Sequence, residues 1–108
     1  MTGVTPERAA RQMTGEGADA VGANCGVGVK EYLPVCRRLR AATTLPIWIK
    51  PNAGLPEMDN GAAVYRTTPD YFASFLPSLA EAGAGFIGGC CGTSPEFIRA
   101  GARLMVKL

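Results

Sequence analysis

Histidine is absent from this chain of 108 residues, so the imidazole ligand common in zinc sites is not available. Long apolar runs are absent too: the longest, around Leu45–Ile49 and Ala84–Ile87, are far shorter than the ~20 residues that cross a bilayer. The opening residues Met1–Glu7 lack the basic and apolar regions of a secretory signal, so we expect a cytoplasmic protein without a membrane partner. Net charge is only +2 and the basic residues are scattered, which argues against nucleic-acid binding.

The chain has four cysteines, at positions 25, 36, 90 and 91. Cys90 and Cys91 are adjacent, which makes them a poor disulfide staple, and no secretory signal is visible. Metal binding, catalysis or free thiols are therefore favoured over structural disulfides. Cys36 lies on the apolar face of a predicted helix, with Tyr32, Val35 and Leu39, and is assigned to the core.

Helices and strands are predicted to alternate along the chain. A hydroxyl, a proline and an acid follow one another at Thr5–Glu7, Thr68–Asp70 and Ser94–Glu96, which is typical of a helix start. The predicted helices are Pro6–Gly15, Lys30–Ala42, Pro69–Ala82, with a bend or break at Pro77, and Pro95–Val106. The predicted strands are Ala18–Gly22, Pro46–Lys50 and Ala84–Gly88, and Pro51–Thr67 is predicted to be a loop.

Two segments of the sequence repeat each other, Gly17–Gly26 and Gly83–Gly92. In each, a helix ends at glycine, a short apolar strand follows, and cysteine comes just past the end of the strand. Strands that alternate with helices form parallel sheets, whose carboxyl ends lie on one side. We therefore expect Cys25 to meet Cys90 and Cys91 at the side where β/α barrels build their active sites.

The predicted fold class is α/β, with three parallel β/α units. A β/α barrel has about eight strands, and three strands leave its interior open and a sheet edge unpaired. The first predicted element is a helix with no strand before it. We therefore expect the chain to be the C-terminal three units of a (β/α)8 barrel, incomplete as given, that begins before Met1.

Three cysteines at strand ends provide three thiolates and leave a fourth metal position open, as at catalytic rather than structural zinc sites. Sulfur ligands favour Zn²⁺ over magnesium or manganese. Zn²⁺ with three thiolates carries a net charge of about −1, which suits holding a substrate thiolate, the nucleophilic form of a thiol. Gly88, Gly89 and Gly92 supply the backbone freedom that two adjacent ligands need. The predicted reaction is alkyl transfer to a thiol.

Other interpretations of these residues stay open. Cys25 alone could be a buried apolar residue, and the Cys90–Cys91 pair could form a strained redox disulfide. Asn24 could orient a substrate or satisfy backbone groups of its loop. The glycine-rich segment Gly88–Ser94 could bind phosphate at a helix N-terminus, although the cysteines would then have no role. The glycines of Gly83–Gly88 precede their strand, so a dinucleotide-binding fingerprint is rejected.

Three segments, Gly22–Gly26, Lys50–Pro56 and Gly88–Pro95, resemble successive motifs of the homocysteine S-methyltransferase family. The family includes the homocysteine-binding domain of cobalamin-dependent methionine synthase and betaine–homocysteine methyltransferase. The resemblance covers the chain from about Thr5 to Gly101, and the Pro51–Pro56 loop is closest to the methionine synthase branch.

The resemblance implies that residues 1–108 are the C-terminal part of a homocysteine-binding domain with an eight-stranded β/α barrel fold. It implies that Cys25, Cys90 and Cys91 bind zinc and that homocysteine receives a methyl group to give methionine. The donor would be methylcobalamin fed by 5-methyltetrahydrofolate, betaine or S-methylmethionine, and a corrinoid-binding domain is an expected partner. Without the first five strands we expect an inactive, poorly soluble piece that binds zinc weakly or not at all. The alternative is a non-catalytic zinc or thiol module.

Overall fold

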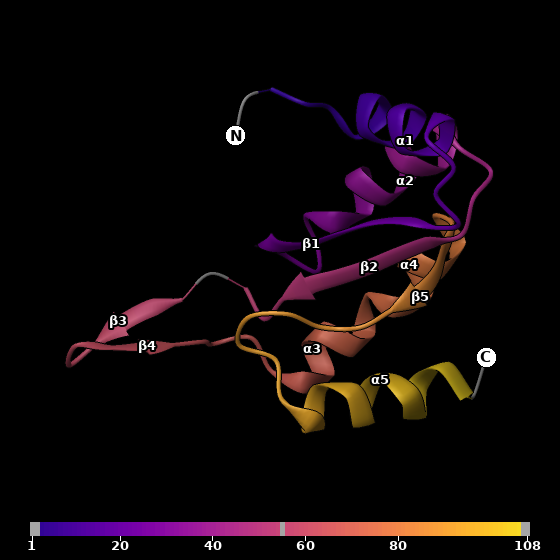
Figure 1. The fold of residues 1–108 in the computed structure, drawn as a ribbon. Helices are drawn as coiled ribbons and strands as arrows, with labels where there is room; N and C mark the ends of the chain where they lie inside the picture. Colours follow the sequence, from indigo (N-terminus) through magenta and orange to yellow (C-terminus); the bar gives the residue numbers. More distant parts are fainter. Residues whose placement is uncertain (1–2, 55, 107–108) are drawn as a thin grey trace.

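Three parallel strands lie at the centre of the computed structural model, which describes residues 3–54 and 56–106 (Figure 1). They are β1 (Val21–Gly28), β2 (Ile47–Asn52) and β5 (Ala84–Ile87), in the spatial order β1-β2-β5. A helical segment follows each strand, so the predicted α/β class and its three parallel β/α units are confirmed. Met1 and Leu55, which entered the sequence interpretation, lie outside the described residues.

Two of the three predicted helix starts carry a side-chain cap. The hydroxyl of Thr5 accepts a hydrogen bond from the N–H of Arg8 at 3.1 Å, and Thr68 does the same for Tyr71 at 3.1 Å. Ser94 instead donates to the Glu96 carboxylate at 2.7 Å. The helices that begin after these residues are α1 (Pro6–Gly15), α3 (Pro69–Ser74) and α5 (Pro95–Val106), and α2 spans Tyr32–Ala42.

The helix predicted over Pro69–Ala82 is broken in two, as its internal proline indicated. After α3 the chain turns at Phe75, and α4 (Leu76–Glu81) carries Pro77 in its first turn. Proline has no N–H to donate to the preceding turn, so it disfavours a continuous helix here and is accommodated in the first turn of a new one. The break leaves Leu79 fully buried against the sheet.

The first strand differs from the prediction at both ends. Instead of Ala18–Gly22, β1 begins at Val21 and continues to Gly28, so Cys25 lies inside a strand rather than past its end. Asn24 pairs with Lys50, and the next pair is Gly28 with Asn52, so β1 advances four residues (28 − 24) while β2 advances two (52 − 50). This irregularity is a bulge. The strand extends because it pairs with β2, which is distant in sequence.

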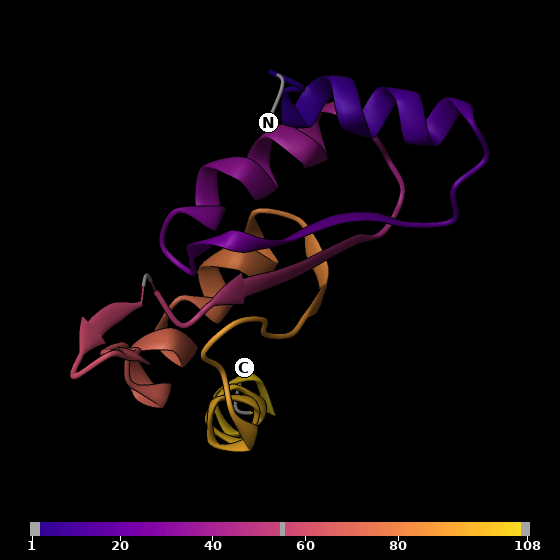
Figure 2. The ribbon, with the colours of Figure 1, turned by 60° about the vertical axis from the view of Figure 1, so that its left-hand side comes forward.

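The segment predicted as the loop Pro51–Thr67 holds regular structure. Its first residues extend β2 to Asn52, and its middle forms an antiparallel hairpin of β3 (Glu57–Asp59) and β4 (Ala62–Val64). The turn between them is Asn60-Gly61, both with positive φ (50° and 79°), which is a favoured hairpin turn. In Figure 1 the hairpin projects beyond the end of the sheet, and in the view of Figure 2 it overlaps α3.

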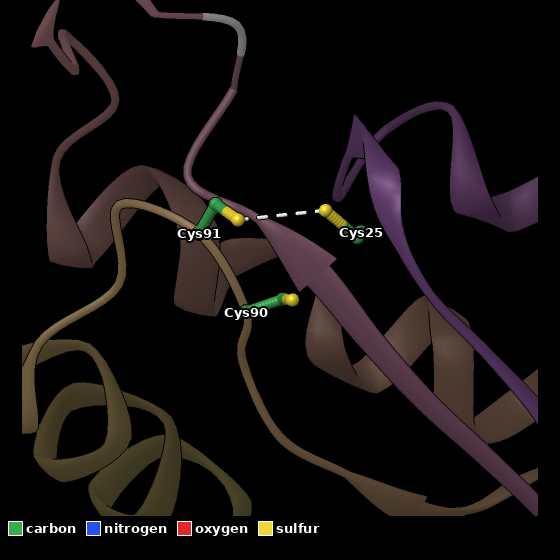
Figure 3. Close-up of side chains that lie close together, drawn as sticks. All are labelled: Cys25, Cys90 and Cys91. Atoms are coloured by element: carbon green, nitrogen blue, oxygen red, sulfur yellow. Dashed lines mark hydrogen bonds between the residues drawn. The ribbon is translucent and has the colours of Figure 1, made fainter.

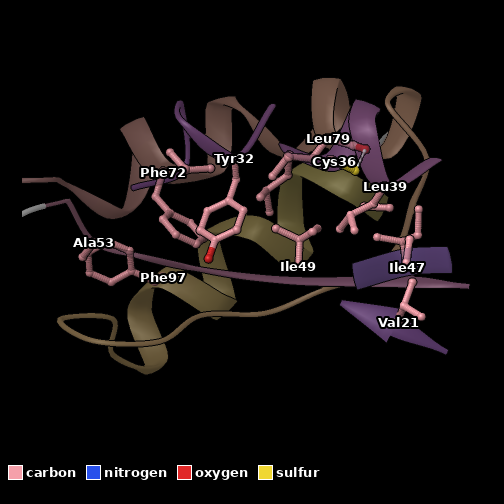
Figure 4. Close-up of a cluster of buried hydrophobic side chains, with 14 residues drawn as sticks. Val21, Tyr32, Cys36, Leu39, Ile47, Ile49, Ala53, Phe72, Leu79 and Phe97 are labelled. Carbon is pink, nitrogen blue, oxygen red and sulfur yellow. Dashed lines mark hydrogen bonds between the residues drawn. The ribbon is translucent and has the colours of Figure 1, made fainter. Parts of the chain in front are cut away.

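Helices α2 and α4 pack on one face of the sheet and bury its apolar side chains. Ile47 and Ile49 of β2 are fully buried there beside Cys36 and Leu39 of α2 (Figure 4). Cys36 is therefore a core residue, as predicted, and its Sγ lies 3.8 Å from the Leu79 carbonyl oxygen. No helix within the described ranges is long and apolar enough to cross a membrane.

The opposite face of the sheet carries large aromatic side chains that remain exposed. Trp48 and Phe86, neighbours on β2 and β5, are 50% and 55% exposed, with ring centroids 5.8 Å apart. The ammonium group of Lys50 lies 5.3 Å from the centroid of the Trp48 ring, within the range of a cation–π interaction. Only the helix-facing side of this sheet is thus covered by the residues that the structure describes.

Candidate metal centre

The sulfur atoms of Cys25, Cys90 and Cys91 converge at the carboxyl end of the parallel sheet (Figure 3). All three lie within 4.8 Å of one another, and the Sγ atoms of Cys25 and Cys91 are 3.4 Å apart. One comes from β1 and two from the segment between β5 and α5. The structure therefore brings together the three residues that the repeat in the sequence predicted as neighbours.

Cys25 owes its direction to the bulge in β1. Its φ is +63°, in the left-handed region that residues with a Cβ rarely adopt, and Gly26 follows with φ +76°. The carbonyl of Cys25 accepts a hydrogen bond of 2.6 Å from the hydroxyl of Tyr32. The bulge in β1 thus turns the Cys25 side chain toward Cys91, which follows β5.

Cys90 and Cys91 are held by hydrogen bonds to the end of β2. The N–H of Cys90 donates to the carbonyl of Pro51 at 2.9 Å, and the carbonyl of Cys91 accepts from Ala53 at 2.9 Å. Gly92 follows with φ +79°, and a Cβ at this position would collide with the ring of Tyr65. The adjacent pair is therefore seated in a turn whose conformation requires glycine.

Two asparagines contact this pair through their side-chain amides. Asn52, only 6% exposed, accepts a hydrogen bond at Oδ1 from the N–H of Cys91 at 3.0 Å. Asn24 donates from Nδ2 to the sulfur of Cys90 at 3.5 Å. Asn24 therefore contacts one sulfur of the cluster directly, and Asn52 contacts the backbone of its neighbour.

The thiols of Cys25 and Cys91 influence each other's ionisation. A hydrogen bond from Cys91 is the main reason that the pKa of Cys25 is lowered, and the Gly26 N–H lowers it further. The same contact with Cys25 raises the pKa of Cys91 to about 11. The proton therefore stays on Cys91 while Cys25 ionises first.

Tyr32 remains a hydrogen-bond donor in this surrounding. Burial is the main cause that raises the pKa of its hydroxyl, and negative charge on Cys25 and Cys90 raises it further. A phenol with a raised pKa keeps its proton at neutral pH. The bond from Tyr32 to the Cys25 carbonyl is therefore maintained.

The three sulfurs have a separation that fits a zinc ion. Tetrahedral zinc with Zn–S bonds of about 2.3 Å keeps its sulfur ligands ~3.8 Å apart. The separations among these sulfurs include 3.4 Å and do not exceed 4.8 Å, so small side-chain adjustments reach that spacing. With three thiolates from this chain, a fourth coordination position is left for another ligand. Soft sulfur donors suit zinc better than magnesium or calcium.

The glycine-rich segment is poorly suited to bind phosphate, the alternative considered for Gly88–Ser94. Its N–H groups at Cys90, Cys91 and Thr93 already donate to protein oxygens at 2.9–3.1 Å. A phosphate loop instead presents its N–H groups to the ligand. The groups that this turn offers to a ligand are therefore the cysteine sulfurs rather than these backbone N–H groups.

Comparison with known proteins identifies the family of this chain. The sequence model of the family described as homocysteine S-methyltransferase matches residues 1–105. The chain belongs to the homocysteine S-methyltransferase family. The resemblance noted in the three sequence motifs is thereby confirmed over nearly the whole chain.

Two relatives in the family are methionine synthases, from Mycobacterium leprae (strain TN) and Mycobacterium tuberculosis (strain ATCC 25618 / H37Rv). Each is 40% identical over 84 residues, which cover 77% of this chain and 7% of the relative. The chain therefore spans less than a tenth of the length of these enzymes.

Solved structures of the homocysteine methyltransferase MmuM from Escherichia coli are similar in fold. The metallated form gives a TM-score of 0.66 at 27% identity, over 90% of this chain and 28% of MmuM. The apo form gives 0.69 at 28% identity, over 90% and 31%. The parallel sheet described above is thus shared with this family member, of which the chain spans less than a third.

Sequence reasoning missed the contacts made by Tyr32 and Asn52. Tyr32 was assigned only to an apolar helix face, although a buried tyrosine needs a partner for its hydroxyl. Asn52 was noted only as part of a motif, although a buried asparagine needs hydrogen bonds as well. In both cases the residue type indicated a polar contact, but only the fold identifies the partner.

Proposed function

We propose that this chain supplies the metal ligands of a zinc-dependent homocysteine S-methyltransferase, which transfers a methyl group to the thiol of homocysteine and forms methionine. Its zinc ligands are Cys25, Cys90 and Cys91. The observation that supports this most directly is the convergence of three sulfurs within 4.8 Å in a chain of this family.

The residues of this site have different proposed roles. The lowered pKa of Cys25 favours its thiolate, the form that binds a metal, and Asn24 donates a hydrogen bond to the sulfur of Cys90. Asn52 fixes the backbone at Cys91. Zinc, when bound, supplies positive charge that stabilises a substrate thiol as the nucleophilic thiolate. We propose that Asn24 also faces the substrate, because it lies on the exposed side of β1 beside the cluster.

We propose that residues 1–108 are the C-terminal part of a homocysteine-binding domain, and that the complete domain is a (β/α)8 barrel. The open face with Trp48 and Phe86 then becomes the inner wall of the barrel, and the free edge of β5 pairs with a further strand. The match to this chain covers only 28–31% of the E. coli MmuM chains, which supports a complete domain about three times as long as this chain. Methyl transfer is expected to require the rest of the barrel.

Several methyl donors are compatible with this proposal. Similarity to two methionine synthases favours methylcobalamin, fed by 5-methyltetrahydrofolate, and hence a corrinoid-binding domain as partner. Betaine and S-methylmethionine are the other donors proposed. A cytoplasmic location is consistent with four cysteines that are all unpaired, because thiols persist in reducing compartments.

Zinc content and thiol titration before and after chelation test the metal site first. About one zinc per chain, with three thiols that become reactive on its removal, is the expected result if these strands suffice to build the site. No zinc and freely reactive Cys25, Cys90 and Cys91 in the complete domain would refute the ligand assignment.

Activity is tested in the complete domain with homocysteine and each methyl donor. Cys90→Ala is expected to abolish zinc binding and methionine formation together, whereas Cys36→Ala, which alters a buried residue away from the cluster, keeps both. Methionine formation by Cys90→Ala without zinc would contradict the mechanism. Stoichiometric zinc without turnover for any donor would favour the non-catalytic zinc module instead.

A further inference from the structure

Tyr32 connects the core of the protein to the candidate metal centre. It is the first residue of α2, its ring is 5% exposed within the main apolar cluster, and its hydroxyl reaches the carbonyl of Cys25 at 2.6 Å. The ring is therefore fixed by packing while its polar end contacts the backbone of a cysteine that belongs to the cluster.

The backbone of Cys25 is in a conformation that needs such support. A φ of +63° is unfavourable for a residue with a Cβ, and persists where the surroundings enforce it. The segment from Cys25 to Tyr32 is also closed by the N–H of Gly28, which donates to the Glu31 carboxylate at 3.3 Å. In the left-handed conformation the Cys25 sulfur lies 3.4 Å from that of Cys91.

We propose that Tyr32 is a positioning residue for the metal centre: its hydroxyl holds the carbonyl of Cys25 and thereby fixes the direction of the Cys25 sulfur toward Cys90 and Cys91. The proposal deepens the proposed function, because the purpose of that direction is metal binding. Outer contacts of this kind orient metal ligands, and their loss typically weakens metal affinity about 10- to 100-fold.

Tyr32→Phe is the appropriate variant, because phenylalanine keeps the buried ring and removes only the hydroxyl. Tyr71→Phe is a matched control that removes a hydroxyl from a half-exposed tyrosine of α3. The first measurement needs no metal. In a Cys90→Ala background without zinc, Cys25 and Cys91 are equilibrated with glutathione, so that two protein thiols and one oxidised glutathione give one protein disulfide and two reduced glutathiones.

The equilibrium constant for this disulfide reports how well the two sulfurs are held together. Tyr32→Phe is expected to lower it about fivefold, the value of one typical hydrogen bond, and Tyr71→Phe to leave it unchanged. An unchanged constant in Tyr32→Phe would overturn the proposal. The buried Cys36 remains in place throughout.

Zinc affinity, measured by competition with a chromophoric chelator, is the second readout. Tyr32→Phe is expected to bind zinc about tenfold more weakly than the parent protein. When Cys25 is already replaced by alanine, Tyr32→Phe should cause no further loss, because the thiol that Tyr32 orients is gone. An equal loss in both backgrounds would indicate a general structural role and overturn the proposal.

The two readouts separate the two proposals. If the parent protein binds no zinc but Tyr32→Phe still weakens the disulfide, the metal assignment fails and the positioning role stands. If zinc binds and neither readout responds to Tyr32→Phe, the metal assignment stands and the positioning role is wrong.

Discussion

Asn52 accepts a hydrogen bond from the backbone N–H of Cys91 at 3.0 Å, across 39 positions of sequence. Asn52 is the last residue of β2 and is almost fully buried. The preceding residue, Pro51, accepts from the N–H of Cys90 at 2.9 Å. The central strand therefore holds both adjacent cysteines by their backbone, and their side chains are left available for other contacts.

Asn52→Ala is expected to destabilise the protein by about 1 kcal/mol, because it removes the hydrogen bond that the buried Asn52 side chain accepts from the N–H of Cys91. Urea unfolding measures this loss. Asn60→Gly is the control: it alters an exposed hairpin residue whose positive φ glycine adopts readily, so a change within about 0.5 kcal/mol is expected. Equal stability of Asn52→Ala and Asn60→Gly would contradict the role of this bond.

Cys36 is expected to react with thiol reagents far more slowly than the other cysteines in the metal-free protein. Its side chain is fully buried, and burial raises the pKa of its thiol, so little thiolate forms and reagents cannot reach it. Mass spectrometry of peptides after brief alkylation measures the order of reaction. In urea all four cysteines should react alike, and fast alkylation of Cys36 in the folded protein would show that the core is open.

Gly92→Ala is expected to lower stability and to disturb the cysteine turn. The residue has φ +79°, and the new Cβ would meet the ring of Tyr65, so the cost is roughly 1–3 kcal/mol. Gly61→Ala tests the strain alone, because its φ is also +79° but its Cβ would meet no atom within 4 Å. Thermal unfolding of both variants separates the two causes; a larger loss in Gly61→Ala would refute the contact with Tyr65.

The ion pair between Glu7 and Arg38 makes a pH-dependent contribution to stability. Two hydrogen bonds of 2.7 Å join α1 to α2, and the bonds from Arg38 lower the pKa of the Glu7 carboxyl. A carboxyl whose pKa is lowered on folding stabilises the protein above its unfolded pKa of about 4.3, and this is lost as pH falls through the folded pKa.

Glu7→Gln should therefore be less stable than the parent protein near neutral pH, and the difference should vanish in acid. Both partners are partly exposed, so the difference should also shrink with added salt. Chemical unfolding at a series of pH values measures it. A difference that grows as the pH falls would have the wrong sign and would exclude this interpretation of the Glu7 pKa.

Local signals in the sequence predicted the helices well. Pro6–Gly15 and Pro95–Val106 were predicted with the bounds that the structure shows, because a hydroxyl, a proline and an acid specify a start without reference to the rest of the fold. The β3–β4 hairpin was missed although its Asn60-Gly61 turn was readable in the sequence.

Features that depend on distant partners were predicted less well. The end of β1 lies at Gly28 because the strand pairs with β2 beyond a bulge, and no local signal specifies this. The repeat brought the three cysteines together correctly. It could not show that Cys25 lies inside its strand in a left-handed conformation, or that Tyr32 contacts its carbonyl.

The cysteines lie on opposite edges of the sheet order, with β1 at one end and β5 at the other. An ion held by Cys25 and Cys91 would cross-link two positions 66 residues apart, across the end of β2. The three sulfurs meet only when both outer strands have paired with β2, so we expect a bound ion to stabilise the assembled sheet against unfolding. Conversely, withdrawal of the ion would remove the link between Cys25 and Cys91 and leave the contacts of the helix-covered core in place.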